Sequence, residues 1–284
     1  MTLLRSLLFA PGNSQRKLER SADFAADGVV YDLEDAVPDG EKDTARDYVS
    51  TALDWPQAGV RMVRVNALSS KEFRSDLEMA ITPNTWGIIL PKVESRRDLL
   101  DVDSLITGIE SRRGLLVGRV RLLGLVENAR GVSALPDIAR HSLARLDRLI
   151  LGTVDFAADL GLTVGERHPL ELHAAMSVII ASRSAELRAP LDGPFTDLSN
   201  DTRYSSDCEY SHSLGFSGRV VLHPDQVPGA NTAYVDQRDL TWAHRVVEAY
   251  EMSTKSGSGS LSLDGQFIDR PVYLAALRAL GESA

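Results

Sequence analysis

The sequence predicts an α/β fold, specifically a closed (β/α)8 TIM barrel with a C-terminal lid segment. Short apolar runs alternate eight times with helical patterns that open on a polar or capping residue. The first strand-to-helix turn, Pro11-Gly12-Asn13-Ser14, lacks the Gly-rich fingerprint of an open doubly wound sheet. The 284 residues suffice for one barrel, which takes about 250 residues, and a short tail.

Each predicted strand is a short buried run followed by a helix. The first four units pair strands 6–10, 28–33, 61–65 and 87–90 with helices 14–26, 41–55, 69–80 and 95–105. The next four pair strands 121–126, 149–152, 189–191 and 218–222 with helices 132–144, 155–161 plus 169–187, 200–214 and 240–253. Strand 189–191 is short, and it is flanked by Pro190 and Pro194, which cannot donate to a sheet.

The tail begins with a Gly/Ser-rich segment, 253–260, that has the composition of a linker. A hairpin turn at Asp264-Gly265 and a short helix ending near Leu280 follow it. We therefore expect a catalytic barrel over residues 1–253 and a linker with a lid helix over 254–284. A lid or an oligomer contact is one interpretation of this tail, and a simple packing helix is the other.

The composition excludes several classes of protein. A net charge of −9 argues against nucleic acid or an anionic membrane as the main partner, because both need a basic surface. No apolar stretch approaches the ~20 residues that would span a bilayer. The single cysteine, Cys208, excludes an intrachain disulfide and fits a reducing compartment, so we expect a cytoplasmic protein.

Two neighbouring predicted strands each end in a carboxylate, Glu127 after 121–126 and Asp155 after 149–152. Because parallel strands end at the same edge of a sheet, this pair predicts a metal site. Two oxygen ligands suit Mg²⁺, with water and substrate oxygens completing the coordination, better than Zn²⁺. The alternative is that each acid caps the helix that follows it.

Other charged residues follow the second, third and fourth strands. Arg64 is a charged side chain in a buried run, so it needs a carboxylate partner. It is predicted either to bind an anionic ligand beside the metal or to form an ion pair with Glu34 or Asp35. Lys92 follows Pro91 and would be a Schiff-base lysine if it were neutral. The nearby carboxylates favour a charged Lys92 with an electrostatic or structural role.

A small basic cluster lies at the first strand-to-helix junction, formed by Gly12, Asn13, Arg16, Lys17 and Arg20. It suits a phosphate-bearing ligand, and the alternative is an ordinary exposed helix face. We place Asn13, Arg16 and Lys17, together with Arg64 and Lys92, among the residues expected to bind substrate.

Taken together, these segments resemble the citrate lyase beta-subunit-like family of barrel lyases, which includes malyl-CoA and citramalyl-CoA lyases. The resemblance covers essentially the whole chain. The matching segments are Arg5-Ser-Leu-Leu-Phe-Ala-Pro-Gly-Asn13, Asp32-Leu-Glu-Asp-Ala-Val37 with Glu41-Lys42 and Ala45-Arg46, Val63-Arg-Val-Asn66, Leu90-Pro-Lys-Val-Glu94, Val126-Glu127, Leu151-Gly-Thr-Val-Asp-Phe156, Gly215-Phe-Ser-Gly218 with His223-Pro224, and Asp264-Gly-Gln-Phe-Ile-Asp-Arg-Pro271.

The resemblance implies a Mg²⁺-dependent lyase whose site is completed by a second chain. Glu127 and Asp155 would ligate the metal, and Arg64 would hold the substrate oxygens. Glu34 and Asp35 would lie in the outer shell of the site. The resemblance further implies that Asp269, on a lid from a neighbouring subunit, acts as the acid–base group, and that the protein is a homotrimer.

The leading hypothesis is the reversible cleavage of a 3-hydroxy-3-carboxyacyl thioester, of the citramalyl-, malyl- or citryl-CoA type, into a 2-oxo acid and an acetyl thioester. A metal-dependent pyruvate aldolase acting on free oxo acids is one alternative. A beta subunit that binds an acyl-carrier protein within a citrate lyase complex is another. The sequence fixes neither the acyl group nor the carrier, because such differences are decided by the shape of the pocket.

Overall fold

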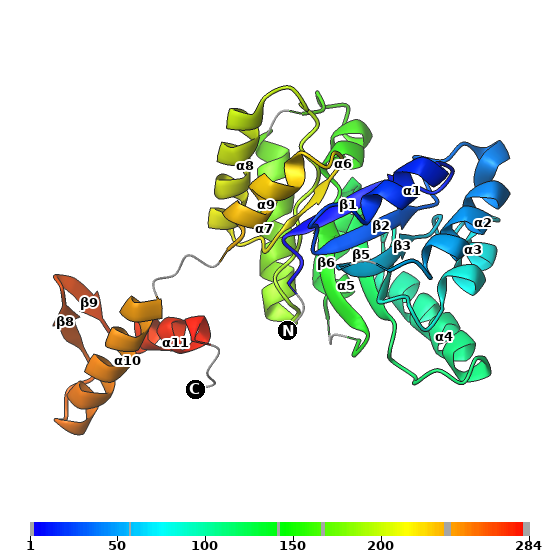
Figure 1. The fold of residues 1–284 in the computed structure, drawn as a ribbon. Helices are drawn as coiled ribbons and strands as arrows, with labels where there is room; N and C mark the ends of the chain where they lie inside the picture. Colours follow the sequence, from blue (N-terminus) through cyan, green and yellow to red (C-terminus); the bar gives the residue numbers. More distant parts are fainter. Residues whose placement is uncertain (1–2, 57, 141–142, 166–167, 236–239, 281–284) are drawn as a thin grey trace. The chain divides into compact units, whose positions relative to one another are not determined.

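Seven parallel strands form one curled sheet in the first part of the chain (Figure 1). The computed structural model describes residues 3–56, 58–140, 143–165, 168–235 and 240–280. The strands lie in the order β6-β5-β4-β3-β2-β1-β7. They are β1 (Ser6–Pro11), β2 (Gly28–Asp32), β3 (Val60–Arg64), β4 (Gly87–Leu90), β5 (Arg121–Val126), β6 (Leu146–Leu151) and β7 (Arg219–Val221).

A short segment at residues 191–192 links the two edge strands of this sheet. Leu191 pairs with Ile150 of β6, and Asp192 pairs with Arg219 of β7, both in parallel. The predicted strand 189–191 is thus present only as two bridges, which fits the missing N–H of Pro190. The α/β class and the curled parallel sheet are confirmed, and the architecture is consistent with a TIM-barrel-like fold.

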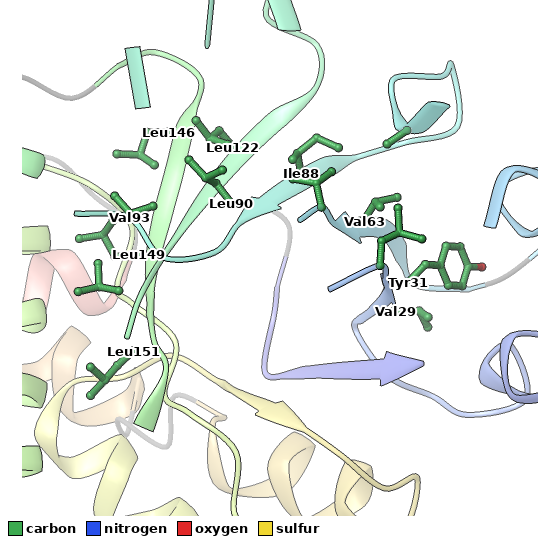
Figure 2. Packing of buried hydrophobic residues seen from close by; sticks show 14 of the residues in the cluster. Val29, Tyr31, Val63, Ile88, Leu90, Val93, Leu122, Leu146, Leu149 and Leu151 are labelled. Atoms are coloured by element: carbon green, nitrogen blue, oxygen red, sulfur yellow. The ribbon is translucent and has the colours of Figure 1, made fainter. Parts of the chain in front are cut away.

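Both sides of the sheet are apolar, as expected for parallel strands covered on both faces. On the outer side, Val29, Tyr31 and Val63 belong to one buried cluster (Figure 2). The same cluster includes helix residues such as Leu18 and Leu99. The intervening strand residues form a second buried cluster, which contains Leu7, Val30, Met62, Ile89, Leu123 and Ile150. This alternation, with a period of two, fixes which side chains point into the curl.

Helices follow the strands and cover the outer side of the sheet (Figure 1). They are α1 (Gln15–Ser21), α2 (Lys42–Ala52), α3 (Phe73–Ala80), α4 (Arg96–Arg112), α5 (Ala129–Ile138), α6 (Thr153–Asp159), α7 (Pro169–Ser184), α8 (Asp201–Leu214) and α9 (Gln226–Ala233), with a 3-10 turn η1 (Asp39–Glu41) before α2. Helix α9 was not among the helices predicted from the sequence. Pro228 is accommodated because it lies in the first helical turn, where its missing N–H has no helical partner to lose.

The chain divides into two compact units, Met1–Tyr234 and Val235–Ala284. The second unit contains α10 (Leu240–Lys255), β8 (Leu261–Leu263), β9 (Gln266–Ile268) and α11 (Arg270–Ala279). Its own small core is built on Ala243, Val246, Ile268 and Ala276. The division therefore falls before α10, whereas the predicted boundary lay between residues 253 and 254.

The difference arises from the apolar face of α10. That face packs within the second unit, where Tyr250 stacks on Tyr273 of α11 with ring centroids 4.6 Å apart. The predicted hairpin is confirmed, with Asp264 and Gly265 both at positive φ between β8 and β9. Among the residues described, no helix is both long and apolar enough to cross a membrane.

Candidate active site

A cavity of about 810 Å³ lies where the strands of the first unit end. Its walls include the last residues of β1, β2 and β3 and residues that follow β5, β6 and β7. In barrels of this kind the loops after the strands carry the chemistry. The predicted site residues that line it are Arg16, Lys17, Asp35, Arg64, Glu127 and Asp155.

Glu127 and Asp155 are brought together by the pairing of β5 with β6. Val126 pairs with Leu151, so Glu127 follows one strand while Asp155 lies in the first turn of α6 after the other. Glu127 is only 2% exposed. Burial, Glu34 and Asp155 all raise the pKa of the Glu127 carboxyl well above its ordinary value. Asp155 is therefore close enough to Glu127 to disfavour the charged form of the Glu127 carboxyl.

Gly152 is the reason that Glu127 fits here. A Cβ atom at position 152 would lie 2.5 Å from Cβ of Glu127 and 2.7 Å from its Oε2. Such distances are far inside van der Waals contact, so only glycine leaves room for this carboxylate. The Gly152 N–H also donates to the Val126 carbonyl at 2.9 Å, which holds the two strand ends together.

The carboxylate pair fits a Mg²⁺ ion. Within the described ranges, no group of three or more His, Cys, Asp or Glu side chains is placed to hold a metal. Mg²⁺ is commonly bound by one or two carboxylates with water and substrate oxygens as the other ligands. A divalent cation would also relieve the repulsion that raises the pKa of Glu127.

Arg64 is held by Asp32, which pairs with it across β2 and β3. Its Nε and Nη2 donate to the two carboxylate oxygens of Asp32 at 2.7 Å each, and its Nη1 lies 3.0 Å from Glu34 Oε2. Burial acts to lower the pKa of the guanidinium, but Asp32 and Glu34 raise it above its ordinary value. The ion pair offered as the alternative reading is present, with Asp35 farther away at 3.9 Å.

Lys92 contacts three of the acids. Its Nζ donates to Glu34 Oε1 at 2.7 Å and lies 3.6 Å from Asp35, while its backbone N–H donates to Glu127 Oε1 at 2.8 Å. Burial acts to lower the pKa of the ammonium, but the hydrogen bond to Glu34 raises it. This supports the charged Lys92 that was predicted over a Schiff-base lysine.

The basic cluster divides between the cavity and the surface. Arg16, Lys17 and Arg20 of α1 line the cavity and are exposed. Asn13 does not line it, and its side-chain amide donates to Glu41 at 2.5 Å instead. The three cations of α1 therefore remain suited to a polyanionic group entering from solvent.

Asp269 lies in the second unit, at the start of α11, where its carboxylate accepts a hydrogen bond from the Val272 N–H at 3.3 Å. His168 is the residue before α7 and helps to start that helix. The Glu171 carboxylate accepts the His168 N–H at 3.2 Å, as in a helix cap.

Two residues of the site were missed from the sequence. Asp32 is buried at the end of β2 and accepts hydrogen bonds from Arg64. The sequence signal that could have identified it was a carboxylate at the end of an apolar run. Gly152 was predicted only as the end of a strand, although a glycine three residues before the strand-end acid Asp155 was a usable hint.

The chain matches the model of the HpcH/HpaI aldolase/citrate lyase family over residues 5–224. It belongs to this family. A member of the aldolase/citrate lyase family is an enzyme, and the curled sheet with a cavity at its strand ends agrees with that assignment.

Known members of the family are similar to the chain over nearly its whole length. The citrate lyase subunit beta of Leuconostoc mesenteroides subsp. cremoris is 33% identical over 98% of this chain and 92% of that protein. The (3S)-malyl-CoA thioesterase of Cereibacter sphaeroides is 29% identical over 98% of this chain and 94% of that protein. The CitE protein of Mycobacterium tuberculosis, solved in complex with magnesium, acetoacetate and coenzyme A, has a TM-score of 0.75 and 27% identity and covers 98% of each chain.

Proposed function

We propose that the protein is a Mg²⁺-dependent carbon–carbon lyase that cleaves a 3-hydroxy-3-carboxyacyl thioester of the citramalyl-, malyl- or citryl-CoA type. The products are a 2-oxo acid and an acetyl thioester. The observation that carries this proposal is the buried Glu127 and the partly buried Asp155 beside Arg64, in one cavity with the cations of α1. The CitE complex with magnesium, acetoacetate and coenzyme A supports the same assignment.

In this proposal Glu127 and Asp155 hold the metal. When bound, Mg²⁺ supplies Lewis-acid chemistry at the hydroxyl and carboxylate oxygens of the substrate. Arg64 offsets the charge on the oxygen that becomes the oxo group, while Asp32 and Glu34 keep its guanidinium fixed. Asp35 and Lys92 complete the charged surroundings of the site.

The thioester carrier would lie along α1. The exposed Arg16, Lys17 and Arg20 match the phosphates of coenzyme A or of a protein-bound phosphopantetheine, and charge-assisted contacts of this kind are strong. We propose a cytoplasmic enzyme whose carrier is one of these two, coenzyme A or a carrier protein.

We further propose that the second unit, with its tail over residues 254–284, is a lid that completes the site of a neighbouring chain in a homotrimer. Asp269 would exchange the proton with the methyl carbon of the acetyl group, donating it in cleavage and removing it in condensation. The support is the resemblance of the segment from Asp264 to Pro271 to the lid of related lyases. A shared site predicts that two defective chains can complement each other.

Complementation tests the lid directly. Co-expression of Asp155→Ala with Asp269→Ala chains should restore about one quarter of wild-type activity, because random trimers pair an intact metal site with an intact neighbouring lid that often. Each variant alone should be inactive. No recovery in mixed trimers, verified by mass spectrometry, would show that the site is completed within one chain.

A coupled assay tests the reaction. The purified protein is expected to release a 2-oxo acid and acetyl-CoA from malyl-, citramalyl- or citryl-CoA only when Mg²⁺ is present. The 2-oxo acid is followed by reduction with a dehydrogenase, and free thiol is followed separately. Absence of any 2-oxo acid from all three thioesters, with the protein folded and Mg²⁺ present, would refute a lyase that acts on CoA thioesters.

The same assay separates three rivals. The malyl-CoA thioesterase relative makes hydrolysis to malate and free thiol a second candidate, which would give thiol without a 2-oxo acid. A pyruvate aldolase would act on free hydroxy-oxo acids without a thioester. A beta subunit dependent on an acyl-carrier protein would be inactive on CoA esters and active on the loaded carrier.

A further inference from the structure

Lys92 has a backbone conformation that its position does not require. The non-glycine residues with positive φ in the described part of the chain are Lys92 (53°), Glu186 (57°) and Asp264 (51°). Glu186 follows the end of α7, and Asp264 lies in the turn of a hairpin, where the left-handed conformation is common. Lys92 follows strand β4 and precedes α4, so it terminates neither a helix nor a hairpin.

The left-handed turn at Lys92 redirects one N–H group. The Val93 N–H returns to the sheet and donates to the Leu125 carbonyl at 3.0 Å. The Lys92 N–H is left outside that ladder and donates to Glu127 Oε1 at 2.8 Å. A backbone that continued as an extended strand would not present the same N–H to the end of β5.

The Glu127 carboxylate is confined on its other side as well. A Cβ at position 152 would lie 2.7 Å from Oε2, so that oxygen lies directly against the backbone of Gly152. The side chain of Lys92 at the same time holds Glu34, whose charge repels that of Glu127. One residue therefore holds both carboxylates, one through its backbone and one through its ammonium group.

We propose that Lys92 is a positioning residue, whose left-handed backbone aims its N–H at Glu127 and so fixes that carboxylate facing Asp155 for a divalent cation. The inference rests on the proposed function, because it takes Glu127 and Asp155 as the metal ligands. It assigns to the backbone of Lys92 a role that its side-chain charge does not explain.

Two substitutions separate the backbone from the ammonium group. Lys92→Gly and Lys92→Val both remove the charge, but glycine adopts positive φ freely whereas β-branched valine resists it. Binding of Mg²⁺ alone, measured by calorimetry, should be within about threefold of wild type for Lys92→Gly. It should be weaker by about 10- to 100-fold for Lys92→Val, the usual effect of losing a group that orients a ligand.

Glu186 provides the matched control, because it has the same backbone conformation on an exposed site outside the cavity. Glu186→Val should lower the melting temperature and leave the Kd for Mg²⁺ unchanged. If Lys92 had a purely structural role, Lys92→Val would give the same result. If Lys92→Val does not fold, Lys92→Ala is measured instead. Its Mg²⁺ binding should be weaker than that of Lys92→Gly and stronger than that expected for Lys92→Val.

The possible results separate this inference from the proposed function. Equal Kd values for the glycine and valine variants at position 92, with Asp155→Ala unable to bind Mg²⁺, would overturn the role of Lys92 alone. Failure of the wild-type protein to bind Mg²⁺, or undiminished binding by Asp155→Ala, would overturn the metal site and this inference with it.

Discussion

Asp155→Ala is expected to abolish Mg²⁺-dependent turnover, with kcat/KM lowered by more than about 100-fold, because one of two metal ligands is removed. Asp155 lines the cavity on the first turn of α6 and is only partly buried, so the fold should tolerate the change. Steady-state kinetics with and without Mg²⁺, together with calorimetric titration of the ion, measure the effect.

The control for this substitution is Asp137→Ala, which removes an exposed acid of α5 outside the cavity. It should leave both turnover and Mg²⁺ affinity at the wild-type level. Circular dichroism and the melting temperature should show that both variants are folded. Substantial Mg²⁺-dependent activity in Asp155→Ala would remove this residue from the metal site.

Gly152→Ala is the second substitution with a large expected effect, although it adds only one methyl group. Its Cβ would overlap Glu127, so either the carboxylate or the end of β6 must shift. We expect Mg²⁺ affinity to fall by about 10- to 100-fold, as for a displaced ligand. Overpacking at such a site costs about 1–3 kcal/mol of unfolding free energy, which chemical denaturation would measure.

Gly108→Ala in α4 is the matched control, because the nearest atom to its added Cβ is 3.7 Å away, on the flexible side chain of Arg112. It should raise the unfolding free energy by about 0.5–1 kcal/mol, as alanine does in a helix interior, and leave Mg²⁺ binding unaltered. If Gly152→Ala bound Mg²⁺ with wild-type affinity, the tight fit around Glu127 would have no part in metal binding.

The strands and the strand-end acids could be predicted because both follow from local pattern. A buried apolar run must pair with neighbours, and consecutive β/α units place their carboxyl ends together, so Glu127 and Asp155 could be expected at one edge. The weak strand at 189–191 was recognisable from Pro190, and it is present only as two bridges.

What could not be predicted depends on contacts between distant segments. Arg64 makes its bidentate hydrogen bonds to Asp32 and not to Glu34 or Asp35. The β2–β3 register determines this choice, and no local sequence pattern encodes that register. Positive φ at Lys92 is not expected for lysine. The apolar face of α10 suited packing on the sheet as well as on α11, so the sequence did not indicate that α10 packs within the second compact unit.

The pairing of Asp32 with Arg64 also bears on how the sheet finds its alignment. These residues are direct partners across β2 and β3, and a slip of one residue would turn Arg64 outward among apolar helix contacts. An unpaired guanidinium in that layer would cost several kcal/mol, so the misaligned sheet is disfavoured during folding. A substitution of Asp32 or Arg64 should therefore impair the folding of the chain as well as its chemistry.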